Sequence, residues 1–463
     1  MLVDTVVELS RWQFAITAIL HFLFIPLTLG LALLLAVMES AYVWRGRALY
    51  KAMAQFWGRV FAINFVLAVS TRLVLIFQFG LNGSYFAHYV GDVFALPLAI
   101  EALGSFFLAA ALFGPYWFGW DAMGKKQHLC LTWLIALAVN VSAFWVLMAN
   151  GWMQNPVGAA FNYQSYRIEL SDFAQLLHNP AALAKYLHTV AASYVVACAT
   201  VLGIGAYWLR LRQDDALARL SYKLAAGAGV LALGVTIGLG DSTPTLDNPV
   251  QQAKRAAISG QPDSGLLPGI EARIRNGMQA YALLEQLRDG DTKPQLLADF
   301  ERFKQDLGYA MLLQPLHKQI DEASDKHIKL AAQSALPAHP GLLRGLYLLM
   351  IGCGIVVAFG FVLAAWGGMG DKAMPDWLLS ISIYLAPLPW LASVAGWFVA
   401  EAGKQPWAVA GLLPTFWAVS SQSVTQLLVS SVGFSLAYLI LLGLAVFLLR
   451  QTVMSRRIVN KEA

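Results

Sequence analysis

The sequence predicts an all-α polytopic membrane protein with about nine transmembrane helices, and two observations carry that prediction. Of its 463 residues, 58% are hydrophobic and only 13% are charged, which is more apolar than a soluble domain of this size needs. The apolar residues also gather into runs long enough to cross ~30 Å of hydrocarbon at ~1.5 Å per helical residue. We expect spans at 13–38, 55–81, 93–119, 128–150, 187–209, 220–240, 342–366, 377–400 and 424–449.

Basic residues between these spans predict the direction in which the chain crosses the membrane. Residues 82–92 contain no Lys or Arg, whereas alternate connections and the tail are basic. The basic residues are Arg45, Arg47, Lys51, Lys125, Lys126, Arg210, Arg212, Arg219, Lys223, Arg450, Arg456, Arg457 and Lys461. Because basic loops stay in the cytoplasm, we expect the N-terminus outside and the C-terminus in the cytoplasm. The net charge of +5 is explained by these loops, so no nucleic-acid partner is expected.

The chain divides into three parts. Residues 1–240 hold the first six spans, and 342–463 hold the last three with a short cytoplasmic tail. Between them, 241–341 form one long outer loop, and a loop of this length is usually functional. Apolar residues at helical spacing predict one amphipathic helix in the loop, and a second is expected around 294–313. The residues at that spacing are Ile270, Ile274, Met278, Tyr281 and Leu284.

Two further expectations concern the N-terminus and the cysteines. The first apolar run is too long for a cleavable signal peptide, so we expect it to remain as a span. Cys130, Cys198 and Cys353 are few, widely spaced and placed inside apolar spans. We therefore expect reduced core residues rather than a disulfide framework or a metal site.

Four residues that can bind haem iron fall in four different spans, all in the predicted outer half of the bilayer. They are His21, His188, Met350 and Glu401, and Glu101 lies at a similar depth. Any one of them could have an ordinary role, since a buried His often hydrogen-bonds a neighbouring helix and a Met often only packs. Ionisable groups inside spans are costly, and five such residues at one depth favour a functional site.

The remaining histidines lie at span ends or in loops, where solvated or structural roles are expected. They are His88, His128, His178, His317, His327 and His339.

Around these residues the chain resembles subunit I of cytochrome bd quinol oxidases, nearly from end to end. The motifs that carry the resemblance are LSRWQFAITAILHFLFIPLTLG (9–30), FQFG (77–80), HYVGDVFALPLAIE (88–101), FGWD (118–121), ANGWMQNP (149–156), LHTVA (187–191), EARIRNGMQAYALLEQLR (271–288), PLPW (387–390) and GWFVAEAGKQPW (396–407).

The resemblance implies a low-spin haem b, a high-spin haem b and a chlorin-type haem d near the outer face. His188 and Met350 match the axial ligands of the low-spin haem, and two protein ligands suit an electron-transfer iron. His21 and Glu401 match the single ligands of the two high-spin haems, and which residue serves which haem stays open. A single ligand leaves one iron position free for dioxygen.

Other positions acquire roles from the same resemblance. Glu101 resembles the carboxylate beside haem d that helps deliver protons, and Trp397 matches a tryptophan near the haems. Lys254 matches the lysine of the quinol-binding loop. Lys404, Arg72 and Arg11 are the expected partners of haem propionates or of other charges.

The implied protein is the haem-bearing subunit of a quinol:oxygen oxidoreductase in the bacterial cytoplasmic (inner) membrane. It would reduce O2 to water with electrons from ubiquinol or menaquinol, and it would be electrogenic without pumping. Besides the lipid bilayer, its partners would be a second membrane subunit and often a very small third one.

Several positions depart from the family pattern, and they concern protons, propionates and quinol. A second glutamate of the family is Ala109 here, and the arginine before the Met ligand is Leu348. The family's GRQPW arginine is Lys404, and a glutamate of the quinol loop is Ser259. Near FQFG, Ile76 replaces a glutamate and Gly83 replaces a tryptophan.

Arg72 is the most informative departure, because a cation inside a span needs a partner. We predict that Arg72 pairs with Glu101 or with a haem propionate. Pairing with Glu101 would make that carboxylate a poorer proton relay. The competing interpretation is an Arg72 that extends along a helix interface towards the membrane surface.

Two other functions remain open at this point. A diverged paralogue would keep the fold and haem but oxidise quinol poorly, serving as an assembly or electron-transfer subunit. A transporter is a weaker alternative, because the sequence contains no recognisable inverted repeat or pair of broken helices.

Overall fold

The computed structural model describes residues 2–212, 215–241, 248–261, 264–290, 293–370 and 373–459. Nine helical stretches in these ranges are long and apolar enough to cross a membrane. They are Thr5–Arg45, Ala48–Asn82, Ser84–Phe118, Lys125–Gln154, Phe173–Leu211, Ala216–Gly240, Pro340–Gly368, Asp376–Ala402 and Val424–Ser455. The expected spans are confirmed, although the structure extends several of them.

The spans are built from the following helices. They are α1 (Leu2–Phe22), α2 (Ile25–Arg45), α3 (Ala48–Asn82), α4 (Ser84–Ile100), α5 (Phe107–Phe118), α6 (Lys125–Gln154), α7 (Phe173–Leu177), α8 (Pro180–Leu211), α9 (Ala216–Asp241), α15 (Pro340–Gly368), α16 (Asp376–Leu385), α17 (Leu388–Ala402) and α19 (Val424–Val459). The long loop and the shorter connections add α10 (Pro249–Ser259), α11 (Leu267–Arg288), α12 (Pro294–Phe303), α13 (Leu307–Ala310), α14 (Asp325–Ser334) and α18 (Thr415–Ala418).

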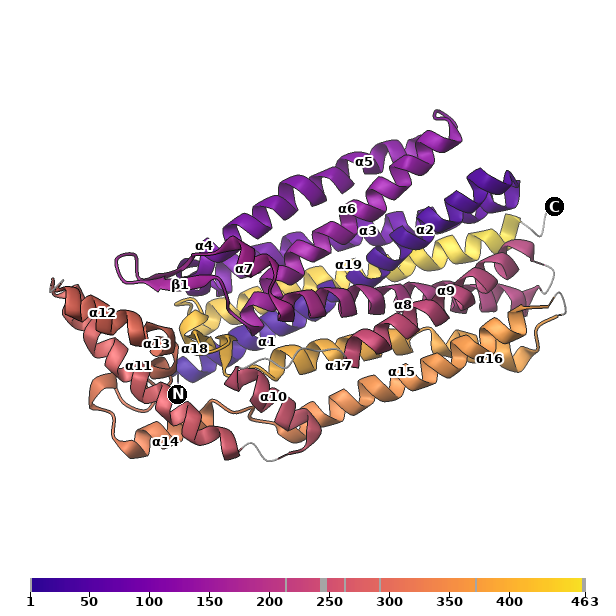
Figure 1. Cartoon of the computed structure of the whole chain (residues 1–463). Coiled ribbons are helices and arrows are strands. Elements are labelled where there is room, and N and C mark those ends of the chain that lie inside the picture. The colour runs from indigo at the N-terminus through magenta and orange to yellow at the C-terminus, as the bar shows by residue number, and fades with distance from the viewer. Residues whose placement is uncertain are drawn as a thin grey trace.

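The long helices run side by side in an elongated bundle (Figure 1). Helices α10–α14 gather at the end that also holds the N-terminus, and the C-terminus lies at the opposite end. The long loop therefore caps the end that holds the N-terminus, because six crossings precede it, and the three crossings after it place the C-terminus at the opposite end. The membrane orientation itself remains the prediction of the basic loops.

Two spans are interrupted close to proposed site residues. The first breaks between α1 and α2, one residue after His21, and Pro26 opens the new helix. The third contains Pro97 and then a π-helical turn, Glu101–Phe106. Because proline lacks an N–H and crowds the preceding turn, it opens the backbone ladder at these points. Interruptions of this kind often mark functional positions in helices.

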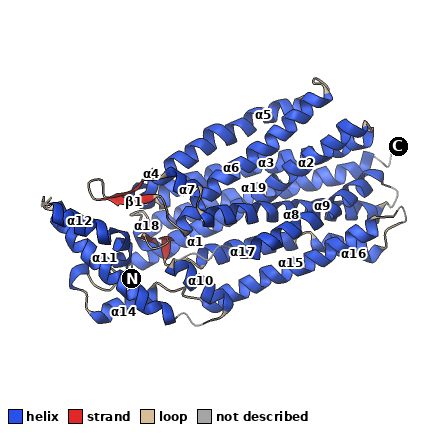
Figure 2. Ribbon diagram, viewed as in Figure 1, coloured by secondary structure: helices blue, strands red, loops and turns tan. Residues whose placement is uncertain are grey.

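The strands are few and lie at the loop-covered end (Figure 2). Strand β1 (Ala159–Asn162) pairs antiparallel with β2 (Arg167–Leu170), with Ala159 opposite Leu170. Strand β3 (Trp407–Val409) pairs antiparallel with β4 (Leu413–Pro414). Trp407 is fully buried and contacts Tyr309 of α13 with ring centroids 5.0 Å apart. The second hairpin therefore ties the end of the eighth span to the long loop.

The loop helices confirm the amphipathic pattern. Ile270 and Ile274 of α11 are buried in a small core of their own, apart from the main bundle core. The second expected helix, 294–313, is present as α12 and α13 joined by short 3-10 turns.

The cysteine prediction is correct in part. All three thiols are free, and Cys198 and Cys353 are buried. Cys130, however, is exposed. It belongs to α6, in which the nearby residues His128 and Leu131 are buried. Cys130 therefore lies on the exposed side of this helix.

Candidate functional site

Glu401, near the end of α17, is the centre of a group of amines. Its Oε1 accepts hydrogen bonds from Lys185 Nζ and Asn150 Nδ2, both at 3.2 Å. Its Oε2 lies 2.8 Å from Lys404 Nζ. A carboxylate offers about four acceptor positions. Since three are used, one remains on Oε2 for a metal ion, and the two ammonium groups supply a positive surround that suits haem propionates.

Trp397 connects this group to the first span. Its ring stacks on Phe22 of α1, with centroids 5.4 Å apart and planes at 21°. The ammonium of Lys185 lies 4.9 Å from the centroid of the same ring. Trp397 therefore lies between Lys185, which pairs with Glu401, and Phe22, which follows His21.

Met350 lies directly against α17. A Cβ added at Gly396 would approach the Met350 sulfur to 2.8 Å. A larger residue at Gly396 would push the Met350 sulfur aside, and Gly396 precedes Trp397 in the chain. The methionine of α15 is thus adjacent to the same turn that carries Trp397.

His188 is one helical turn beyond Lys185 on α8. The structure places it eight residues inside that helix, so the predicted start of the fifth span at residue 187 is wrong. The helix begins early because Asn179 caps it and Pro180 occupies its first turn. The His188 Nδ1 is buried and has no hydrogen-bond partner in the described part of the chain. A buried ring nitrogen without a partner fits a histidine that serves as an axial haem ligand.

Gly240 of α9 closes the other side of His188. A Cβ at Gly240 would lie 3.3 Å from the His188 Cε1 atom. Small residues thus flank both members of the proposed His188–Met350 pair, Gly240 on one side and Gly396 on the other.

His21 is oriented by Thr71 of α3. The His21 Nδ1 lies 2.9 Å from the Thr71 hydroxyl, which is itself 2.9 Å from the carbonyl oxygens of Leu67 and Ala68. Because those carbonyls can only accept, the hydroxyl donates to the backbone and accepts from Nδ1–H. That arrangement leaves the lone pair on Nε2, which is how a metal-binding histidine is usually held.

Arg72 and Glu101 form the ion pair that the sequence predicts. Arg72 Nη1 donates to Glu101 Oε1 at 2.6 Å, and Nη2 donates to Oε2, so the contact is bidentate. Ser142 of α6 donates to Oε1 as well. Glu101 is fully buried, and the Arg72 guanidinium lies 4.7 Å from the Phe106 ring centroid. The competing interpretation of Arg72 is therefore excluded.

Lys254 brings the long loop to the same end of the bundle. Its Nζ donates to Gln154 Oε1 at 3.2 Å, and Gln154 Nε2 donates to the Ala400 carbonyl at 3.1 Å. Burial is the main reason that the pKa of Lys254 falls to about 7. The nearby charge of Lys185 lowers that pKa further, and Glu401 opposes the change. An amine of this pKa can gain or lose a proton near neutral pH.

The proposed residues are thus brought together with one exception. Arg11 pairs with Glu8 on the same helix, and both side chains are exposed, so its described contact lies outside the group. Three important members were missed from the sequence, namely Lys185, Asn150 and Gln154. Lys185 had a usable signal, because it is a cation one turn before a histidine at the start of an apolar span.

The departures from the family pattern occupy distinct environments. Ala109 is buried in the bundle core, so no charge has replaced the missing glutamate there. Leu348 and Ile76 are more than half exposed and point away from the group. Ser259 ends α10, where its hydroxyl donates to the Ala256 carbonyl at 3.1 Å. Only Lys404 and Arg72 therefore act directly on the carboxylates of the site.

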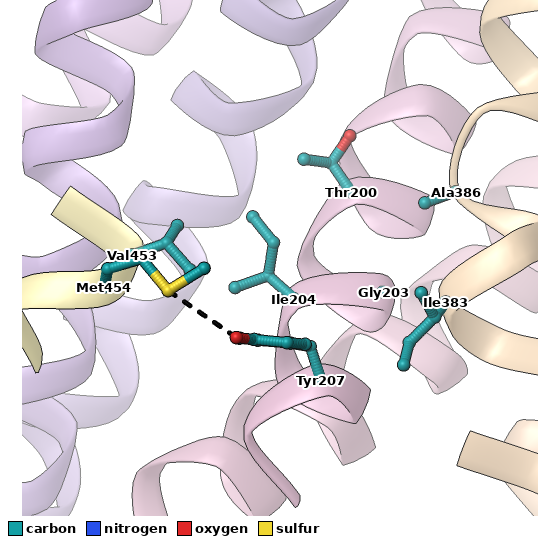
Figure 3. Close-up of a pocket in the computed structure, with 8 residues that line it drawn as sticks. All are labelled: Thr200, Gly203, Ile204, Tyr207, Ile383, Ala386, Val453 and Met454. Atoms are coloured by element: carbon teal, nitrogen blue, oxygen red, sulfur yellow. Dashed lines mark hydrogen bonds between the residues drawn. The ribbon is translucent and has the colours of Figure 1, made fainter. Parts of the chain in front are cut away.

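A cavity of about 280 Å³ lies near the other end of the bundle, between α8, α16 and α19 (Figure 3). Apart from Thr200 and Tyr207 its lining is apolar, and the Tyr207 hydroxyl donates to the Met454 sulfur at 3.5 Å. It contains none of the proposed iron ligands. The functional group described above is therefore separate from this space.

A helical membrane bundle with two histidines, a methionine and a glutamate gathered towards one end fits the class of membrane haem proteins. The model of the family described as cytochrome bd terminal oxidase subunit I matches residues 9–457. The chain belongs to that family, and it is a multi-pass oxidoreductase of the bacterial inner membrane.

Similar proteins cover almost the whole chain. It is 36% identical to cytochrome bd-II ubiquinol oxidase subunit 1 of Escherichia coli (strain K12), over 96% of each chain. It is 34% identical to cytochrome bd ubiquinol oxidase subunit 1 of Bacillus subtilis (strain 168), over 95% of this chain and 92% of the other.

The fold agrees with a solved structure. The bd oxidase from Geobacillus thermodenitrificans superimposes with a TM-score of 0.73, covering 99% of this chain and all of the other, at 22% identity. At that identity the similarity shows the fold alone.

Proposed function

We propose that this chain is the haem-bearing subunit of a quinol:oxygen oxidoreductase. The observation that supports this best is the connected group around Trp397. The Trp397 ring contacts Phe22, which follows His21, and Lys185, which pairs with Glu401 and lies one turn before His188. Met350 packs against Gly396, the residue before Trp397. The four possible iron ligands thus lie on four different spans next to residues that contact one another.

In this proposal His188 and Met350 hold a low-spin haem b, while His21 and Glu401 each hold a high-spin haem, one of b type and one of d type. The haems supply electron transfer and the reduction of O2 to water. The chain orients the ligands, as Thr71 does for His21, and Gly240 and Gly396 allow helices to approach His188 and Met350 closely. Lys185 and Lys404 neutralise the carboxylate of Glu401.

The quinol side of the reaction is proposed at Lys254. Its amine is held by Gln154 next to the end of α17, and its pKa near 7 suits the exchange of a proton with a quinol hydroxyl. The relatives are named for ubiquinol, and a more distant Bacillus subtilis relative, 24% identical, is named a putative menaquinol oxidase subunit. Either quinol fits the chemistry of an amine and an amide.

Protons for oxygen reduction are proposed to come from the cytoplasm, which makes the reaction electrogenic without a pump. Glu101 would be a weak relay in this chain, because Arg72 chelates both of its oxygens. We propose a second membrane subunit, with a very small third one, against the exposed apolar faces of the spans. Phe118, Phe359 and Ile440 are examples of the large apolar residues on those faces.

The alternative is a diverged paralogue with haem but little quinol oxidation. The Arg72–Glu101 pair and the neutral Ala109 position favour it, because both remove proton carriers of the family pattern. The intact set of iron ligands favours the oxidase.

The test is a reduced-minus-oxidised optical spectrum of the purified complex, followed by oxygen uptake with ubiquinol and with menaquinol. The oxidase predicts a low-spin b signal, a far-red chlorin band and quinol-dependent uptake. Normal haem signals without uptake would support the paralogue. Absence of haem would contradict both.

A further inference from the structure

A buried pair of titratable residues, Glu39 of α2 and His128 of α6, lies outside the site described above. Both are only 2% exposed, and His128 Nδ1 is 2.7 Å from Glu39 Oε1. From its place at the end of a span, His128 is predicted to be solvated or structural, and its burial excludes the solvated role. The pair joins two spans that are far apart in sequence.

The pair lies near the end of the bundle opposite the long loop. His128 is three residues after the start of α6, and Glu39 is six residues before the end of α2. The connection between α5 and α6 is drawn at the end away from α10–α14 (Figure 1). By the basic-loop prediction this end is cytoplasmic. About one helical turn separates the pair from that surface.

The hydrogen bonds require a proton between the two residues. His128 Nε2 is 3.0 Å from the Tyr116 backbone carbonyl, which can only accept, so Nε2 carries a hydrogen. Nδ1 therefore faces a carboxylate oxygen with no hydrogen of its own in a neutral ring. A contact of 2.7 Å between two acceptors would be repulsive, so one further proton sits between Nδ1 and Oε1. It is shared as carboxylic acid with imidazole, or as carboxylate with imidazolium.

Two more polar groups, the hydroxyls of Thr132 and Tyr116, lie close to the Glu39–His128 pair. Thr132, one turn further along α6, donates to the second carboxylate oxygen, Oε2, at 2.6 Å. The Tyr116 hydroxyl is buried without a hydrogen-bond partner in the described part of the chain. Its ring centroid is 5.4 Å from that of His128. A buried hydroxyl in this position calls for water.

We propose that the Glu39–His128 pair is a proton-holding site that fills from the cytoplasmic end and supplies protons inwards along α6. This rests on the proposed oxidase function, which consumes protons at the other end of the bundle. When the shared proton leaves towards Thr132, a carboxylate faces the bare Nδ1 lone pair. The pair then carries one negative charge and is refilled by one proton from the cytoplasmic side, which restores the starting state.

Helix α6 also reaches the receiving end. Ser142, ten residues after Thr132, donates to Glu101. Asn140 lies between them and accepts from the Tyr194 hydroxyl at 2.9 Å. Ten helical residues span ~15 Å, so water molecules must carry the proton between these side chains. Because Ala109 and the Arg72–Glu101 pair weaken the family's carriers, a separate proton store near the cytoplasm has a clear use here.

The test uses the purified oxidase complex with the substitution Glu39→Gln. Glutamine keeps the hydrogen bonds to Thr132 and His128 but cannot hold the exchangeable proton. We expect unchanged haem spectra, oxygen uptake reduced by at least about tenfold, and a larger slowing in D2O than in the parent. Ser40→Ala is the control, because Ser40 is the next buried residue and bonds only Ala36 and Trp133. Its turnover should equal that of the parent.

Two further measurements can contradict the proposal even if Glu39→Gln gives no result. If Glu39→Gln does not assemble, Thr132→Val removes the inward hydrogen bond and leaves the pair intact, and it should also slow turnover. Infrared spectra of the parent in H2O and D2O should contain an exchangeable band from this pair that Glu39→Gln lacks. That readout needs no turnover, so it separates failure of the oxidase function from failure of the proton store. Parental rates in both variants, or identical infrared spectra, would overturn the proposal.

Discussion

Two buried carboxylates at the loop-covered half of the bundle are neutralised in opposite ways. Glu401 is surrounded by two lysines and an amide, each making a single contact. Glu101 is chelated through both oxygens by one guanidinium and receives a serine hydroxyl as well. The planar fork of arginine fixes a carboxylate, whereas ammonium groups act as movable point charges. Arg72 therefore holds Glu101 in one orientation, whereas the separate contacts of Glu401 can rearrange.

The largest expected effect follows from removing Arg72. Arg72→Leu would leave Glu101 as an unpaired buried charge, which costs about 3–5 kcal/mol of unfolding free energy. Chemical unfolding in detergent measures it. The double variant Arg72→Leu, Glu101→Gln should recover most of the loss, because no charge remains. A loss below about 1 kcal/mol in the single variant would show that the pair does not hold the helices.

Gly396→Ala comes next and tests whether Met350 belongs to the group. The added Cβ would lie 2.8 Å from the Met350 sulfur, so we expect a loss of up to about 3 kcal/mol from overpacking. The low-spin haem signal should fall with it in the optical spectrum. Gly352→Ala is the control, because a Cβ there meets nothing within 4 Å. Equal spectra for the two variants would remove Met350 from the proposed ligand pair.

Lys404→Met tests whether the other groups that contact Glu401 can hold its carboxylate when one lysine is removed. We expect a loss of about 2 kcal/mol, smaller than for Arg72→Leu, because Lys185 and Asn150 still contact the carboxylate. Lys304→Met is a matched control. Lys304 pairs with Glu301 at the same three-residue spacing, but that glutamate is largely exposed, so the loss should be under about 1 kcal/mol. Thermal unfolding of the three proteins side by side gives the ranking, and equal losses would contradict it.

The smallest effect is a pH dependence at Lys254. Its folded pKa of about 7 lies below the ordinary value of 10.5, so the unfolded chain binds more protons between these values. Stability should therefore rise with pH above about 7, by at most about 2 kcal/mol up to pH 9. The difference in unfolding free energy between the parent and Lys254→Met isolates this rise. Arg255→Gln, at the exposed neighbouring position, should reduce this rise only slightly, because the Arg255 charge is the smallest of the causes that lower the Lys254 pKa.

Much of the fold could be predicted because its signals are local. Each span is a long apolar run, and the structure contains all nine within the described residues. Arg72 was also informative, because a cation deep in a span needs a carboxylate and Glu101 lay at a similar depth. The start of the fifth span was wrong because Asn179 and Pro180 begin the helix in a polar stretch that hydropathy does not count.

The partners across the helices could not be predicted in the same way. Lys185, Asn150 and Gln154 come from helices whose apolar residues cover every side, so the sequence does not indicate which side faces inwards. The Glu39–His128 pair escaped for the same reason, since 89 residues separate its members. Cys130 shows the converse, a residue in an apolar run that faces outwards.

The sequence by itself determined the membrane class, the number of crossings and the residue types that can bind iron, because hydrophobic length and side-chain chemistry are properties of single segments. Only the tertiary structure decided that Trp397 contacts Phe22 and Lys185, that Arg72 binds both oxygens of Glu101, and that Glu39 contacts His128. Those outcomes depend on the rotation and register of packed helices, which many distant contacts set together.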